Sequence, residues 1–219
     1  LQHMGDHFTI PLPQDQGTGL GKPLKIINHL VREDIPIAIA SLGPKSVETT
    51  AEIADAWLPA FYTPEAADAV WGESLKAGKK LRDPNRAVLD IFAGGAVGIG
   101  AGMEPHREKG RAGAALYIGG MGARSKNFYN DIFSKSGYAE EAKLIQDLYL
   151  SGKKDAAAAA IPDDYLAKSS LIGEEAFVTD RINALKESGV TTLNVSFIGS
   201  DPSERIHQCE RLKNLVEKL

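Results

Sequence analysis

Residues 35–59, IPIAIASLGPKSVETTAEIADAWLP, constrain the fold of this chain more than any other stretch. The β-branched and apolar run at 35–40 predicts a strand buried on both faces. Pro44 suits the first turn of a helix, which we expect to reach about Asp55, and the next strand should occupy 57–61. A strand, a helix and a strand in this order form one unit of a parallel sheet, so we expect an α/β protein.

The rest of the chain continues this alternation. We expect further strands at 87–93 and 191–197, and a glycine-rich loop at 94–102. Helices are expected at 64–79, 105–118, 127–135, 138–151, 155–160, 174–188 and 202–218. Four parallel strands are too few to close a barrel of eight and suit half of one. An open, doubly wound sheet is the structural alternative.

Composition limits the class of protein. The chain has 219 residues and a formal charge of −4, so we expect a single domain over 1–219 and no nucleic-acid or anionic-membrane partner. No apolar run approaches the ~20 residues of a membrane span. Its single cysteine, Cys209, fits a cytoplasmic protein. Because the chain begins with Leu1 and not with Met, we expect the biological start to be missing.

The best candidate site is the turn Ser41-Leu42-Gly43-Pro44, where a strand ends and a helix begins. The first N–H groups of a helix lack internal partners, and the helix dipole favours an anion there. Gly43 would let a ligand approach the backbone closely. The alternative is a purely structural turn between strand and helix.

Three other motifs give weaker signals. GTGLGK at 17–22 fails the P-loop spacing, and Pro23 stands where Ser or Thr should be. GIGAG at 98–102 lacks the full dinucleotide-binding pattern. GGMGARSKN at 119–127 is either a mobile cationic segment over a pocket or a helix-helix turn with solvated charges.

The remaining polar and aromatic residues point to no chemistry. We expect Phe128 and Tyr129 to pack in the core. The five histidines show no metal-ligand spacing, and no catalytic residue can be identified.

Four segments of the chain together resemble one known family. They are IPIAIASLGPKSVETTAEIADAWLP, YIGGMGARSKNFYNDIF, LIQDLYLSGKKDAAAAAIPDDYL and INALKESGVTTLNVS. Their combination resembles the luciferase-like monooxygenase superfamily, most closely its branch of coenzyme F420-dependent oxidoreductases.

The resemblance implies a more specific fold. The family fold is a (β/α)8 TIM barrel with an insertion between its seventh and eighth strands. The four expected strands would be strands five to eight, so the chain would be the C-terminal part of an incomplete barrel. The helical insertion would lie within 94–170.

The resemblance also implies site residues. Backbone amides after the fifth strand of the family contact the cofactor phosphate, and this motif maps onto Ser41, Leu42 and Gly43. The cofactor would be coenzyme F420, with FMN as the alternative.

The next strand of the family contributes to the substrate pocket, which implicates Leu58, Phe61 and Tyr62. Family residues that hold the deazaflavin ring lie on the first four strands, so the resemblance assigns no catalytic residue here. The intact enzyme would transfer a hydride between F420 and a small organic substrate, or react with O₂ if it used FMN.

On this interpretation the chain alone should be inactive and should bind F420 weakly. It would form a homo-oligomer or pair with the missing N-terminal half. A different class of function is a non-catalytic half-barrel that serves as a binding or assembly module, because an unclosed sheet exposes edges and an apolar face.

Overall fold

The computed structural model describes residues 2–23, 27–32 and 34–219. Residues 1–35 and 36–219 form two separate compact units. The expectation of a single domain over 1–219 stays a prediction. In the first unit, strands β1 (His3–Met4) and β2 (Thr9–Ile10) pair antiparallel.

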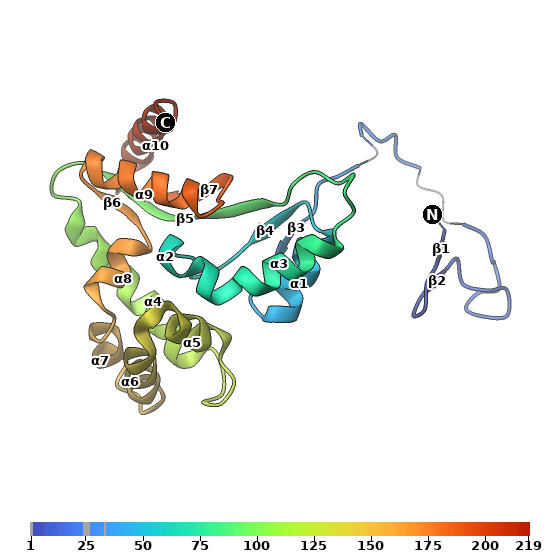
Figure 1. The fold of residues 1–219 in the computed structure, drawn as a ribbon, viewed down its shortest axis with the longest axis horizontal. Helices are drawn as coiled ribbons and strands as arrows, with labels where there is room; N and C mark the ends of the chain where they lie inside the picture. The colour runs from blue at the N-terminus through green and yellow to red at the C-terminus, as the bar shows by residue number, and fades with distance from the viewer. Residues whose placement is uncertain (1, 24–26, 33) are drawn as a thin grey trace. The chain divides into compact units, whose positions relative to one another are not determined.

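The second unit is built on a parallel sheet (Figure 1). Its strands are β3 (Ala38–Ala40), β4 (Ala56–Leu58), β5 (Asp90–Ile99), β6 (Leu171–Gly173) and β7 (Thr192–Phe197). Strand β5 is the longest and pairs with three neighbours: β4 at its start, β7 along its middle and β6 at its end. Every one of these pairings is parallel, which confirms the α/β class. The short strand β6 was not expected from the sequence.

Strand β3 is shorter and more exposed than the buried strand expected at 35–40. Only the last three of the six expected residues form a strand, and β3 pairs with β4 alone among the described strands. Ile37 is 62% exposed, and Ala38 and Ala40 are exposed as well. The prediction of burial on both faces was therefore wrong, because this strand lies at the edge of a sheet that helices cover on one face.

The glycine-rich stretch after Ala93 was also assigned wrongly. Instead of forming a loop, it continues β5 as far as Ile99. A Cβ atom on Gly94 would lie 2.5 Å from the Asn194 carbonyl oxygen, and one on Gly95 would lie 2.6 Å from the Ser169 carbonyl oxygen. Glycine in this strand therefore reflects the close approach of neighbouring backbone.

Helices cover one face of the sheet. They are α1 (Pro44–Ile53), α3 (Glu73–Leu81), α9 (Glu175–Glu187) and α10 (Pro202–Val216). The first two pack together beside β3 and β4, and the other two lie along β5 and β7 (Figure 1). The expected helix at 64–79 consists of α2 (Pro64–Ala67), a π-helical turn and α3 in direct succession. Apolar strand residues on the covered face, such as Ile39, Trp57 and Ile91, form the main core with these helices.

The middle of the chain forms a second group of helices. They are α4 (Gly110–Gly120), α5 (Phe128–Phe133), α6 (Ala139–Leu150), α7 (Lys154–Ala159) and α8 (Asp163–Lys168), with a short 3₁₀ helix, Glu104–Lys109, before α4 and a π-helical turn, Ser134–Tyr138, before α6. These helices bury a core of their own around Ile118, Phe133 and Ile145. None of the helices in the described part of the chain is long and apolar enough to cross a membrane.

The expected break at 119–127 begins two residues later than predicted. Gly119 and Gly120 belong to α4, and a Cβ atom on either would lie 2.5 Å from an atom of the Tyr149 side chain. These two glycines thus allow α4 to approach α6 closely and do not loosen the chain.

The opposite face of the sheet is largely open. Among the described strand residues, the register places on it Ala38, Ala40, Ala56, Leu58, Asp90, Phe92, Gly94, Ala96, Gly98, Ile172, Thr192, Asn194 and Ser196. Apart from Ala56, Gly98 and Ile172, which are buried, these residues are exposed or only partly buried, and none belongs to the main core. Parallel sheets are normally covered on both faces, whereas the helices named above cover one face of this sheet.

Candidate functional site

The turn between β3 and α1 has an open helix N-terminus. Gly43 is the N-cap residue, with φ −74° and ψ 152°, and no side chain caps the helix. Pro44 follows and has no N–H group. In the part of the chain that the structure describes, no protein group accepts a hydrogen bond from the N–H of Lys45 or Ser46. Because α1 is ten residues long, its dipole and free N–H groups can hold an anion here.

Two buried tryptophans fix the carbonyl groups of this turn. The indole N–H of Trp57 donates to the carbonyl oxygen of Ser41 at 3.0 Å. The indole N–H of Trp71 donates to the carbonyl oxygen of Leu42 at 3.2 Å. With both carbonyls held toward the core, the turn has a defined conformation before any ligand binds.

The Ser41 side chain is part of this support. Its hydroxyl lies 2.8 Å from the hydroxyl of Thr50, and both residues are buried. The Thr50 hydroxyl in turn donates to the carbonyl oxygen of Ser46 at 2.7 Å, which identifies the Ser41 hydroxyl as the donor in the first bond. Ser41 could therefore offer a ligand its backbone, while its hydroxyl is already engaged.

An aromatic side chain forms a wall beside the turn. A Cβ atom on Gly43 would lie 3.3 Å from Cε1 of Phe128, the first residue of α5. Phe128 is 50% exposed, so the expectation that it packs in the core was wrong. Asn127 holds it in place: its buried amide donates to the carbonyls of Tyr117 and Ile118, both at 3.0 Å. No sequence signal connects residue 128 with residue 43, since their contact depends on the packing of the helical group.

The three expected pocket residues separate in the structure. Leu58 ends β4 opposite Ala40 and is half-buried. Phe61 has a φ of +60°, which is unusual for a residue with a side chain. Its ring lies 5.4 Å from that of Tyr129 and 5.9 Å from that of Tyr117, so it links the sheet to the helical group.

Tyr62 faces the main core. Its ring stacks on Trp71 with centroids 5.8 Å apart, and its hydroxyl lies 2.9 Å from the Ser188 hydroxyl. Burial raises the pKa of Tyr62, although the hydrogen bond to Ser188 opposes that shift. Tyr62 is therefore part of the main core, whereas the adjacent Phe61 packs against both the main core and the core of the helical group.

Of the two cationic residues at 119–127, one is already engaged in an ion pair. Arg124 is ion-paired with Asp147, which also binds Lys143 at 2.8 Å. Within the residues that the structure describes, Lys126 makes no ion pair. The same residues contain no group of three His, Cys, Asp or Glu side chains that could hold a metal ion.

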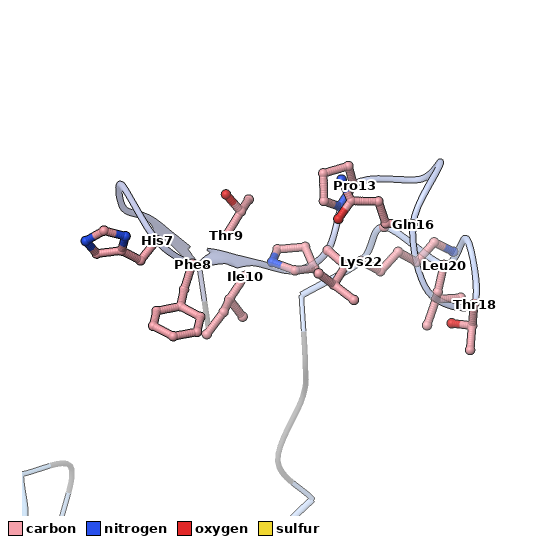
Figure 2. Close-up of a pocket in the computed structure, with 12 residues that line it drawn as sticks. His7, Phe8, Thr9, Ile10, Pro13, Gln16, Thr18, Leu20 and Lys22 are labelled. Atoms are coloured by element: carbon pink, nitrogen blue, oxygen red, sulfur yellow. The ribbon is translucent and has the colours of Figure 1, made fainter.

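The first unit contains a separate hollow of about 600 Å³ (Figure 2). Side chains of His7, Phe8 and Ile10 line one end, and Thr18 and Leu20 line the other. Phe8 and Leu20 are largely exposed, at 74% and 64%. The described lining contains no acidic side chain that could act with a base in catalysis. The turn at 41–43 therefore remains the stronger candidate for a functional site.

Comparison with known proteins identifies the family. The family model described as luciferase-like monooxygenase matches residues 1–192. The chain belongs to the luciferase-like monooxygenase family. The resemblance found in the four sequence segments is thereby confirmed.

Relatives within the family include named F420-dependent proteins. The chain is 35% identical over 201 residues to the "Putative coenzyme F420-dependent oxidoreductase Rv3520c" of Mycobacterium tuberculosis, covering 88% of this chain and 56% of that protein. It is 26% identical over 191 residues to the 5,10-methylenetetrahydromethanopterin reductase of Archaeoglobus fulgidus, covering 84% and 54%. The chain therefore spans about half the length of the curated relatives that it matches.

Solved structures support the fold. The coenzyme F420-dependent tetrahydromethanopterin reductase of Methanopyrus kandleri matches with a TM-score of 0.58 and 22% identity. The match covers 78% of this chain and 47% of that one. At this level of identity the likeness supports a shared α/β fold and carries no information about ligands.

Proposed function

We propose that this chain is the C-terminal part of an F420-dependent oxidoreductase of the luciferase-like family. In the intact enzyme, a hydride would pass between coenzyme F420 and a small organic substrate. The family membership and the F420-dependent relatives support this proposal. The observation that carries it is the uncapped, rigidly held turn at Ser41–Gly43.

The residues of this turn fit a phosphate group. Backbone N–H groups at a helix N-terminus are natural phosphate donors, and Gly43 leaves open a space that a Cβ atom would narrow against Phe128. The turn, Ser41, Leu42 and Gly43, would hold the cofactor phosphate through its backbone. When bound, F420 supplies the carbon that accepts or donates the hydride, and this chain orients it.

The uncovered sheet face supports the half-barrel arrangement. We propose that β3, β4, β5 and β7 are strands five to eight of a (β/α)8 barrel, with β6 and the helices from Glu104 to Lys168 in the insertion. The open face would then be the barrel interior, which a complete barrel fills with side chains from all its strands. The edges of β3 and β7 that pair with no other described strand would pair with the strands that complete the barrel.

Fluorescence titration with F420, and with FMN in parallel, tests this proposal. The chain alone should bind F420 weakly, and binding should strengthen when the part of the family that the chain does not match is added as a second polypeptide. Tight binding by the chain alone would show that the cofactor site is complete here and would contradict the half-barrel proposal. Failure to bind either cofactor in the combined sample would contradict the cofactor proposal, and preference for FMN would support an FMN-dependent monooxygenase.

A matched pair of glycine variants tests the turn itself. Gly43→Ala should weaken F420 binding by the combined sample about 10-fold, the loss expected from one crowded charge-assisted hydrogen bond. Gly113→Ala is the control, because a Cβ atom there would meet nothing within 4 Å. Equal affinity of the two variants would place the phosphate elsewhere.

A second candidate is a non-catalytic binding or assembly module. The uncovered face and the free edges of β3 and β7 favour it, because such surfaces tend to associate. Such a module would pair with itself or with a separate N-terminal half. Light scattering that shows a monomer at all concentrations would speak against this alternative.

A further inference from the structure

A basic cleft lies beyond the carboxyl ends of β5 and β7. It has a volume of about 580 Å³ and lies between the 3₁₀ helix before α4 and helix α10. An adjoining hollow of about 330 Å³ shares His106, Lys109 and Ile198 with it. The carboxyl ends of parallel strands are where α/β proteins usually bind ligands.

The charges that line the cleft are mostly positive. His106, Lys109, His207 and Arg211 contribute basic side chains, and Glu204 contributes the acidic one among the described lining residues. The Glu204 carboxylate already accepts hydrogen bonds from the backbone N–H and the hydroxyl of Ser200, at 2.7 and 2.9 Å. These bonds hold the carboxylate against Ser200, while its negative charge remains at this edge of the cleft.

The basic groups differ in how far they are engaged. Arg211 donates to the carbonyl oxygen of Ile99 at 2.6 Å and lies 3.6 Å from the carboxylate of Glu175. In the part of the chain that the structure describes, Lys109, His106 and His207 form no ion pair. Arg211 therefore fixes one wall, while Lys109 and the histidines remain available to a ligand.

The adjoining hollow is more apolar. Its lining includes Ala96, on the uncovered face of β5, together with Ile172, Ile198 and Leu166. The isoleucine at 198 packs over Gly98, where a Cβ atom would lie 2.6 Å from its Cδ1. A ligand that spans both parts would place a charged group at the basic side chains and an apolar body over the sheet.

We propose that this cleft binds a small organic anion, a carboxylate or phosphate attached to an apolar body. The anionic group would bind Lys109, His207 and Arg211, and the apolar body would lie over Ala96 and Ile198. The cleft contains none of the residues of the turn at 41–43, so this site does not depend on the proposed cofactor site.

Calorimetric titration of the full chain with three probes tests the proposal. Benzoate and phenyl phosphate carry the expected anionic group on an apolar ring, and benzamide is a neutral analogue of benzoate. We expect both anions to bind at least about 10-fold more tightly than benzamide, since hydrogen bonds to charged groups contribute about 1.5–3 kcal/mol. The stronger of the two anions identifies the preferred group.

Variants that replace the basic side chains locate the site. Lys109→Gln and His207→Gln should each weaken anion binding, by about 10-fold for Lys109→Gln, and both positions are exposed, so folding should be unaffected. Lys153→Gln, an exposed lysine at the start of α7 and outside the cleft, is the matched control. Gly43→Ala should leave benzoate binding unchanged, which separates this site from the cofactor turn.

Three results would overturn the proposal. They are absence of anion binding at millimolar concentration, equal affinity for benzoate and benzamide, and unchanged anion affinity in both Lys109→Gln and His207→Gln.

Discussion

The two faces of the same sheet differ in composition and in burial. On the covered face, Ile39, Trp57 and Ile91 pack with the helices in the main core. On the opposite face, the neighbouring residues Ala40 and Phe92 remain exposed or half-buried. Since successive side chains of a strand point to opposite faces, the same strand contributes residues to the buried face and to the open face. The covered face therefore supplies most of the apolar burial that stabilises the unit, and the open face adds less to it.

The strongest test of this comparison removes a large side chain from the covered face. Trp57→Ala should lower the free energy of unfolding by about 3–5 kcal/mol, because the ring is fully buried and its N–H holds the carbonyl of Ser41. Urea denaturation measures the change. Phe92→Ala, on the open face, is the control and should cost clearly less. Equal losses would mean that the two faces contribute alike.

Adjacent positions in β7 sharpen the comparison. Val195 packs against the main core, whereas Asn194 lies on the open face and is exposed. Val195→Asp should destabilise the unit by about 2–4 kcal/mol, since it places a charge against apolar side chains. Asn194→Asp should change stability by no more than about 0.5 kcal/mol. Thermal unfolding of both variants checks the pair, and comparable losses would contradict the assignment of faces.

A smaller effect is expected where the covered face supports the turn. Trp71→Phe removes the indole N–H that donates to the carbonyl of Leu42 and should cost about 1 kcal/mol. The same variant should weaken F420 binding by the combined sample, because the turn loses part of its support. If stability falls without any change in affinity, the tryptophan has a structural role only.

The smallest expected effect concerns the edge strand and depends on pH. A hydrogen bond from the N–H of Ile37, together with Arg86, holds the pKa of Asp55 below its usual value. The carboxylate therefore stabilises the fold above the unfolded pKa of about 4, and this contribution is lost as the pH falls through the lower folded pKa.

Asp55→Asn should flatten the pH dependence of unfolding below about pH 4, with some loss of stability at neutral pH. Acid titration followed by circular dichroism would record the change. Asp6→Asn, an exposed position in the first unit, should leave the curve as it is in the natural chain. An unaltered curve for Asp55→Asn would show that the edge strand does not depend on this carboxylate.

Local patterns in the sequence were sufficient for several elements. Pro44 begins α1, as its fixed φ favours, and Gly189 follows α9 with a φ of +98° that glycine adopts readily. The turn at Ser41–Gly43 lies between strand and helix as expected. Helix starts, helix ends and family segments can each be recognised within a short stretch of sequence. For this reason the sequence alone determined the α/β class, the family and the position of the candidate turn.

Contacts between distant segments decided the rest. The glycines of β5 and of α4 read as loop signals, and only the nearby backbone of Asn194 and the ring of Tyr149 show why glycine is required in regular structure. Likewise, Phe128 borders the turn because a helix 85 positions later in the chain packs there. A local pattern reports the conformation that a segment prefers, but burial and close approach depend on which other segments pack against it, and only the tertiary structure supplies that information.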